Sequence, residues 1–139
     1  MRVDNWDSKL QKVISETVNN DKFVRGKNDC VTFTQQCVEA ITGKNIFKHK
    51  WTSLKDAKEL VKKLNKKDLL DAAKWVAEQN NFKVIDVNFA QRGDILYYKD
   101  NLDLDGTLGV CIGSNTMFNW KKGMTIIPNT ECEIAWRIE

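Results

Sequence analysis

Cys30 is the residue of this sequence with the clearest capacity for covalent chemistry. It follows a turn at Gly26, where glycine can take backbone angles closed to other residues, and a polar pair, Asn28-Asp29, that can cap a helix. In the first turn of a helix, the partial positive charge of the helix end favours a thiolate, which is a nucleophile. A cysteine in such a position more often simply packs, and its activation also requires a base within hydrogen-bond reach. The pattern therefore indicates a nucleophile, with a packing role as the alternative.

The other three cysteines, Cys37, Cys111 and Cys132, predict neither a zinc site nor disulfides. The sequence has no C-x-x-C pair, which is the usual ligand spacing for zinc. Disulfides are not expected either, because the sequence shows no export signal. Cys37 lies two helical turns after Cys30 and shares its helix face. We expect Cys37 to point into the core and Cys30 to lie at the rim of that face.

An acidic segment, Asn101-x-Asp103-x-Asp105-Gly106, imitates the start of an EF-hand calcium loop. The twelfth position of such a loop requires a bidentate glutamate, but Ile112 stands there. The flanking residues have the pattern of strands, whereas an EF-hand needs helices. We expect an acidic hairpin loop, with weak calcium binding as the alternative, and the sequence predicts no metal site and no cofactor.

Helices must position Cys30, and the 3.6-residue spacing of apolar residues predicts four of them in the first part of the chain. They are expected over residues 6–18, about 29–42, 53–64 and 68–79. Residues that commonly cap helices stand at their starts, namely Asp4 or Asn5, Asp29, Ser53 and Asp68. Gly43 provides a C-terminal stop for the second helix.

After residue 82 the pattern changes to short runs of β-branched and aromatic residues separated by turn residues. Strands are expected over residues 83–87, 94–98, 108–112, 116–120, 125–127 and 134–138. Helices followed by a run of antiparallel strands are typical of an α+β domain. We expect N-terminal helices packed on a C-terminal antiparallel sheet or half-barrel of five or six strands, in a single domain over residues 1–139.

The composition indicates an ordinary globular protein. Of the 139 residues, 42% are hydrophobic and 29% charged, and the net charge of +3 arises from interspersed basic and acidic residues, so nucleic acid is not an expected partner. The stretch Lys55 to Lys67 is rich in lysine but interrupted by acids; we read it as a solvated helix face, with binding of an anionic polymer as the alternative. No apolar run reaches the ~20 residues of a membrane span, and no signal peptide is recognisable, so we expect synthesis in the cytoplasm without membrane insertion.

Three segments occur in an order that is known from one superfamily: Phe23 to Phe33, with the pattern F-x-x-G-x-N-D-C-x-x-F, then Gly93 to Tyr98, and then Leu108 to Gly113. Together they resemble the NlpC-like branch of the papain-fold cysteine peptidases, over nearly the whole chain. In that superfamily an Asp-Cys pair opens a helix, a Gly-Asp pair precedes a strand, and a later strand brings a histidine to the sulfur. The closing Ala135-Trp136-Arg137, with Trp6 and Leu10, looks closer still to a small NlpC-like family encoded in bacteriophage genomes, often beside tail genes.

The resemblance assigns roles to three residues of this chain. Cys30 takes the place of the nucleophile, Thr107 the place of the catalytic histidine, and Asn119 the place of the polar residue that orients the base. An amide can hold an imidazole, so Asn119 fits its role. A threonine hydroxyl has no proton affinity near neutral pH, so Thr107 cannot deprotonate a thiol. Cys111 replaces the tyrosine of the same strand.

His49, the only histidine, is the remaining candidate base. It lies among lysines in the connection after the helix of Cys30, which favours a solvated surface residue over a catalytic one. Slow thiol chemistry without a base is also possible, since a thiol at a helix start can be partly ionised.

The resemblance and the missing histidine together predict a virion structural component of a bacteriophage, in the tail or the head-to-tail region, that has lost hydrolase activity. It would be made in the bacterial cytoplasm and contact other virion proteins, and peptidoglycan is a further possible partner. One alternative is an active cysteine endopeptidase or amidase that opens the cell wall for genome delivery. The other is a module that binds the cell wall without cutting it.

Overall fold

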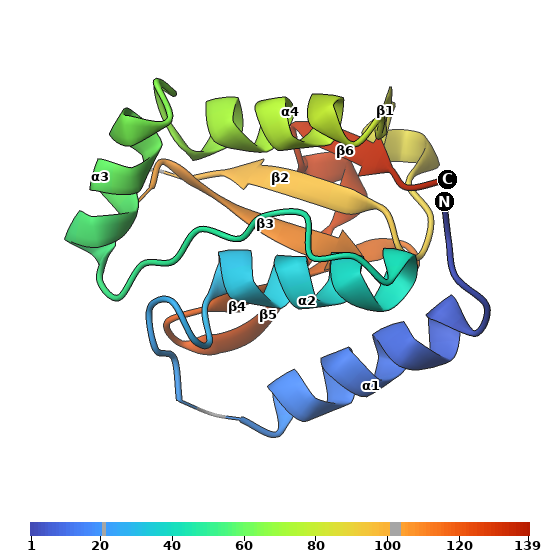
Figure 1. Cartoon of the computed structure of the whole chain (residues 1–139). Coiled ribbons are helices and arrows are strands. Elements are labelled where there is room, and N and C mark those ends of the chain that lie inside the picture. The colour runs from blue at the N-terminus through green and yellow to red at the C-terminus, as the bar shows by residue number, and fades with distance from the viewer. Residues whose placement is uncertain (21, 101–103) are drawn as a thin grey trace.

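The computed structural model describes residues 1–20, 22–100 and 104–139. In this part of the chain, four α-helices come first and an antiparallel sheet follows them (Figure 1). The helices within these ranges are α1 (Trp6–Val18), α2 (Cys30–Thr42), α3 (Leu54–Lys63) and α4 (Leu69–Gln79). The strands are β1 (Lys83–Ile85), β2 (Ile95–Lys99), β3 (Gly106–Cys111), β4 (Asn115–Trp120), β5 (Gly123–Pro128) and β6 (Ile134–Arg137). Two short 3-10 helices complete them, η1 (Val87–Phe89) and η2 (Asn129–Glu131). The predicted α+β class and order of elements are confirmed.

The strands form one sheet in the order β1-β6-β2-β3-β4-β5, and each pair of neighbours is antiparallel. The last strand, β6, lies between β1 and β2, which places the end of the chain in the middle of one half of the sheet. The two termini lie side by side in Figure 1, and the Arg2 Nε donates to the Ile138 carbonyl oxygen at 2.8 Å.

Three of the four helices begin at the predicted caps. Asp29, Ser53 and Asp68 each accept a hydrogen bond from the backbone three residues later. The predicted side-chain cap of α1 is wrong, because Asn5 has a left-handed backbone (φ 58°) and its side chain makes no capping bond. A capping side chain normally requires an extended backbone at that position.

The predicted strands are correct in number and order, and their boundaries differ by a few residues. β1 ends at Ile85 instead of residue 87, because the Asp86 carboxylate accepts the Asn88 N–H at 2.8 Å and begins η1. β3 begins two residues earlier than predicted, at Gly106, where the Tyr97 ring lies against the glycine and leaves no room for a Cβ.

The two faces of the sheet carry two separate apolar clusters, as the alternation of side chains in strands requires. Ile95 and Tyr97 of β2 face the helices, together with Leu108 and Val110 of β3. The opposite face packs against the 3-10 segments through a smaller cluster, made of Leu96, Cys111, Phe118, Ile127, Cys132 and Ala135. The helices therefore cover one face, and the candidate nucleophile at the start of α2 belongs to that layer.

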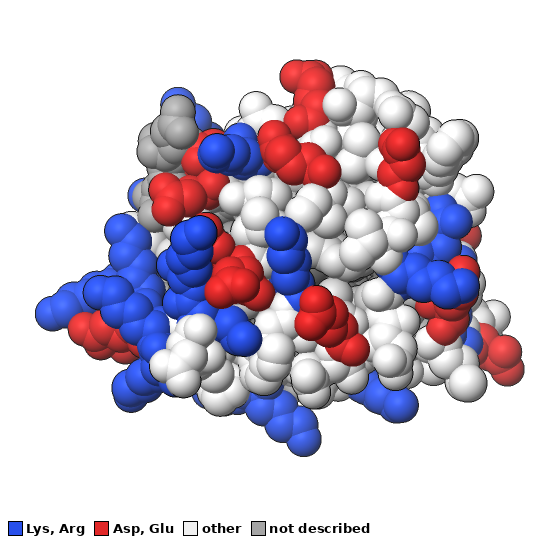
Figure 2. All heavy atoms as spheres, turned by 90° about the horizontal axis from the view of Figure 1, so that it is seen from above, with Lys and Arg blue, Asp and Glu red and all other residues white. Residues whose placement is uncertain are grey.

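Lysines gather at the end of the molecule that carries α3, on the left of Figure 2. Most basic residues of the Lys55 to Lys67 stretch are exposed, with acidic residues between them. This surface agrees with the expected solvated helix face.

Candidate functional site

The turn before α2 is built around Gly26 and Asp29. Gly26 has φ 87°, a conformation that favours glycine, and a Cβ there would overlap the Trp51 carbonyl oxygen. Asp29 is the cap of α2: its Oδ1 accepts the Thr32 N–H at 2.8 Å, and its own N–H donates to the Thr32 hydroxyl at 2.8 Å. The sequence GKNDC therefore folds into a fixed turn that places Cys30 at the first position of the helix.

The Asp29 carboxylate also connects this turn to the segment that follows α2. Its Oδ2 accepts the Gly26 N–H at 2.7 Å and the Trp51 indole N–H at 2.8 Å, and the side chain is 1% exposed. A carboxylate that accepts several N–H bonds in a buried position is a strong local anchor. The sequence analysis identified Asp29 as a cap but missed the bond from Trp51, which lies 22 residues away.

Cys30 faces β3 at the place where β3 and β4 separate. The pairing of these strands covers Gly109 to Cys111 of β3, whereas the preceding residues of β3 pair only with β2. The thiol lies against the Thr107 hydroxyl and the backbone of Leu108. The structure thus brings together Cys30 and Thr107, which the alignment of the two motifs predicted.

Burial raises the pKa of the Cys30 thiol above its ordinary value. The contacts with Thr107 and Leu108 and the charge of Arg25 lower it, and the negative charge of Asp29 raises it further, but desolvation is the largest effect. Cys30 is 6% exposed, so it is buried and does not lie at the rim as predicted. The helix end was expected to lower the pKa of Cys30 and favour the thiolate, and this prediction is wrong. The loss of water around the buried thiol raises its pKa by more than the helix dipole lowers it.

Thr107 offers the sulfur no base. It is 2% exposed, and its hydroxyl makes no hydrogen bond of ordinary length and angle with any residue that the structure describes. It approaches the sulfur closely enough to lower the pKa of the thiol, but a hydroxyl cannot hold the proton near neutral pH.

Asn119 lies beside the same turn, on β4. Its Nδ2 donates to the Asn28 Oδ1 at 2.8 Å and to the Asp29 carbonyl oxygen at 3.4 Å, and the residue is 4% exposed. The amide thus holds the start of α2 against the sheet. Asn119 was predicted to stand in the place of a residue that orients a base, and the group that it holds in the structure is the turn before Cys30.

His49 does not replace the missing base. Its ring is exposed and lies 4.9 Å from the Phe47 ring, centroid to centroid. It lines a small pocket with Trp75 and Val76 of α4, and it is not among the groups that act on the Cys30 thiol. The expected surface role of His49 agrees with this position.

A second buried carboxylate, Asp94, stands in the Gly-Asp motif. It is 0% exposed; its Oδ2 accepts the Gln91 N–H at 2.7 Å, and Arg137 donates to both of its oxygens, at 3.2 and 2.9 Å. The motif match drew attention to Asp94 and Arg137 without giving them roles. Their roles are structural, because together they join the start of β2 to the end of β6.

Nothing in the described ranges forms a group of three or more histidine, cysteine, aspartate or glutamate side chains able to hold a metal ion. Asn101 and Asp103 of the acidic segment that imitates a calcium loop lie outside the described residues. Asp105 is exposed, and its carbonyl oxygen accepts the Tyr97 hydroxyl at 2.9 Å. All four cysteines are free and buried.

These features define an α+β domain in which a buried cysteine at a helix start faces a threonine of the sheet. The chain belongs to the family described as a domain of unknown function, DUF6950, whose model matches residues 1–138. No curated protein matches the sequence. In the described part of the chain, no helix is both long and apolar enough to cross a membrane.

Proposed function

We propose that this chain is a non-hydrolytic member of the NlpC-like branch of the papain-fold cysteine peptidases and a structural component of a bacteriophage virion. The observation that carries the loss of hydrolysis is the contact between the Cys30 thiol and Thr107. A cysteine peptidase needs a base that takes the thiol proton, and a threonine hydroxyl cannot take it.

The arrangement of the three motifs supports the relationship to this superfamily. The Asp-Cys pair opens a helix, the Gly-Asp pair directly precedes β2, and β3 lies against the cysteine. The position that would hold the catalytic histidine is occupied by Thr107, and the position of the orienting residue by Asn119. The proposal therefore explains why polar residues remain around a thiol that lacks its base.

Burial argues against hydrolysis independently of the missing base. Cys30 and Thr107 are 6% and 2% exposed, and a peptide carbonyl must approach the sulfur to be attacked. The raised pKa keeps the thiol protonated at neutral pH. The placement in the virion follows from the resemblance to phage-encoded proteins found beside tail genes, and other virion proteins are the proposed partners.

The loss of hydrolysis is tested with purified chain and bacterial peptidoglycan, by the release of free amino groups. We expect no release above the buffer level. Release that disappears in Cys30→Ala but persists in Cys132→Ala would show an active peptidase; Cys132 is a matched control because it is also a buried thiol with 6% exposure.

The virion role is tested by mass spectrometry of purified particles of the phage that encodes the chain. We expect the chain in a fixed ratio to the tail proteins. Its absence from particles would refute the structural role. Retention on peptidoglycan sacculi without cleavage would favour a wall-binding module instead.

A further inference from the structure

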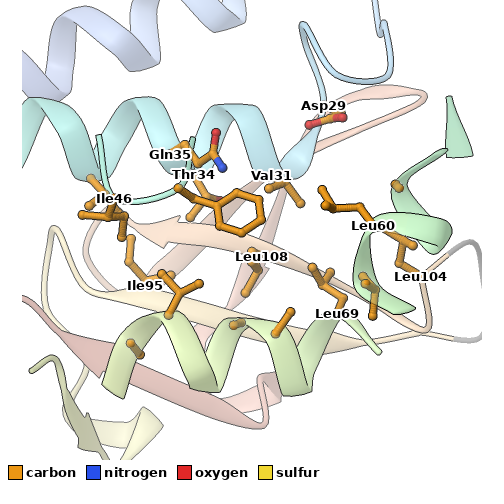
Figure 3. Close-up of a pocket in the computed structure, with 18 of the residues that line it drawn as sticks. Asp29, Val31, Thr34, Gln35, Ile46, Leu60, Leu69, Ile95, Leu104 and Leu108 are labelled. Carbon is orange, nitrogen blue, oxygen red and sulfur yellow. The ribbon is translucent and has the colours of Figure 1, made fainter. Parts of the chain in front are cut away.

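A cavity of about 120 Å³ lies between the helices and the sheet. Figure 3 shows Val31, Thr34 and Gln35 of α2 along one wall, and Leu69 of α4 on the other side of the space. Leu108 of β3 lies between them. Cys30 and Thr107 do not line this cavity, but Asp29 and Trp51, which hold the turn before Cys30, do.

The cavity exists because the helices present small side chains to it. The lining residues of α3 and α4 include four alanines, which are Ala57, Ala72, Ala73 and Ala77. The rest of the wall is almost wholly aliphatic or aromatic, with Phe47 and Trp136 among its residues. An apolar cavity of roughly 150 Å³ lined by similar residues stays free of water and binds benzene. The space here therefore suits an apolar molecule of about five to seven non-hydrogen atoms.

Two polar groups in the wall have no partner. Thr34 is 6% exposed, and neither its hydroxyl nor the Gln35 side-chain nitrogen bonds to any described residue. Other threonines in the helices behave differently: the hydroxyls of Thr17 and Thr42 each donate to the carbonyl four residues earlier at 2.8 Å. An unpaired buried polar group is costly, and both of these groups can donate a hydrogen bond.

The lining contains two charged residues, Arg25 and Asp29, and the Arg25 guanidinium lies over the Phe23 ring, 4.9 Å from its centroid. Asp29 already accepts the N–H groups of Gly26, Thr32 and Trp51. A carboxylate ligand would lose its hydration in an apolar space, which is much more costly than the transfer of a neutral group. A neutral oxygen that accepts from Thr34 and Gln35 avoids this cost.

We propose that this cavity binds a small neutral apolar molecule with one hydrogen-bond acceptor, such as a short alkyl ketone, whose oxygen lies at Thr34 and Gln35. The hydrocarbon part fills the space left by the alanines. This site is independent of the proposed function, because it shares no side chain with the pair of Cys30 and Thr107.

The test compares two probes of equal shape, 2-hexanone and 2-methyl-1-hexene, in which a methylene group replaces the oxygen. Binding to the full chain is measured by calorimetry and by amide shifts in NMR spectra. We expect saturable binding of both, with shifts at Thr34 and Gln35. Thr34→Val keeps the shape of the side chain but removes the hydroxyl, so it should weaken 2-hexanone by about 3- to 10-fold and leave the alkene unchanged.

Two further variants separate the cavity from the rest of the protein. Thr17→Val makes the same change at a buried helix position outside the cavity and should leave both probes unaffected. Ala72→Leu fills the cavity and should abolish the binding of both probes. If this variant does not fold, Ala73→Leu serves the same purpose, because Ala73 also lines the cavity.

Three results would overturn the proposal. The first is no saturable binding of either probe, which would mean a dry packing gap or water only. The second is binding that survives the filling variants, since the probes would then bind elsewhere. The third is an equal change in the affinities for 2-hexanone and 2-methyl-1-hexene in Thr34→Val, which would show that the Thr34 hydroxyl does not bond to the ketone oxygen.

Discussion

Replacement of Asp29 by alanine tests the central role of its carboxylate. The side chain is 1% exposed and accepts N–H groups from the preceding turn (Gly26), from the first turn of α2 (Thr32) and from the Trp51 indole. Asp29→Ala removes all of these acceptors at once. The turn, the helix and the connection after it would lose their common anchor.

The expected loss follows from the separate bonds. Removal of an aspartate cap costs about 1 kcal/mol. The N–H groups of Gly26 and Trp51 are then left without an acceptor, at about 1–3 kcal/mol each. We expect Asp29→Ala to lower the free energy of unfolding by about 4 kcal/mol. A domain stability of about 5–15 kcal/mol would still leave a folded fraction to measure.

The measurement is urea unfolding followed by circular dichroism, with Asp68→Ala as the matched control. Asp68 caps α4 through one bond, from the Asp71 N–H at 2.9 Å, and is only half-buried. Its removal should cost about 1 kcal/mol. Equal losses in the two variants would refute the reasoning, because Asp29 would then be no more than an ordinary cap.

Three other results are expected. Arg137→Ala should cost about 2 kcal/mol in urea unfolding, since it leaves the buried Asp94 carboxylate with the longer ion pair to Arg2, at 4.0 Å, while Arg92→Ala, which removes an exposed ion pair, should cost less than about 1 kcal/mol; similar losses would contradict this. Burial raises the pKa of Cys132 from 9.0 to about 11, so its contribution to stability is complete below pH 9.0 and lost as the pH rises towards 11. The thermal unfolding temperature of Cys132→Ala should therefore fall less steeply than that of the unchanged chain between pH 9 and about 11. Parallel plots of unfolding temperature against pH for the two proteins would exclude the effect. Cys30 should react with iodoacetamide more slowly than free cysteine at pH 7–8, because its pKa is raised; mass spectrometry of the labelled peptide checks this, and rapid labelling would show an activated thiol.

Local rules were sufficient for the helix starts and for the class of fold. A cap depends on residues within one turn, so Asp29, Ser53 and Asp68 could be identified from sequence alone. The approach of Thr107 to Cys30 was also predictable, although only from an order of motifs that resembles the order in a known superfamily. Neither periodicity nor spacing relates a helix start to a strand 77 residues later.

Tertiary packing decided what local rules could not. The helix dipole predicted a lowered pKa for Cys30, but the direction is set by burial under the sheet, which no local pattern reveals. The bond from Trp51 to Asp29 and the unpaired Thr34 likewise depend on how a connection and three helices close over the sheet. Thr34 reads in the sequence as an ordinary residue of a buried helix face.

The start of α2 combines features that oppose thiol chemistry and stabilise the fold. Asp29 anchors the turn through buried bonds, and the same negative charge raises the pKa of the neighbouring Cys30 thiol. A positively charged imidazolium beside the sulfur would offset the negative charge of Asp29, but the neutral hydroxyl of Thr107 cannot. In a protein that does not use the thiol as a nucleophile, the negative charge of Asp29 beside the sulfur does no harm. Burial of the thiol then stabilises the fold through apolar contact. Under the proposed loss of a catalytic histidine, nothing would require Cys30 to stay accessible, so the proposal accounts for a thiol that is both buried and without a base.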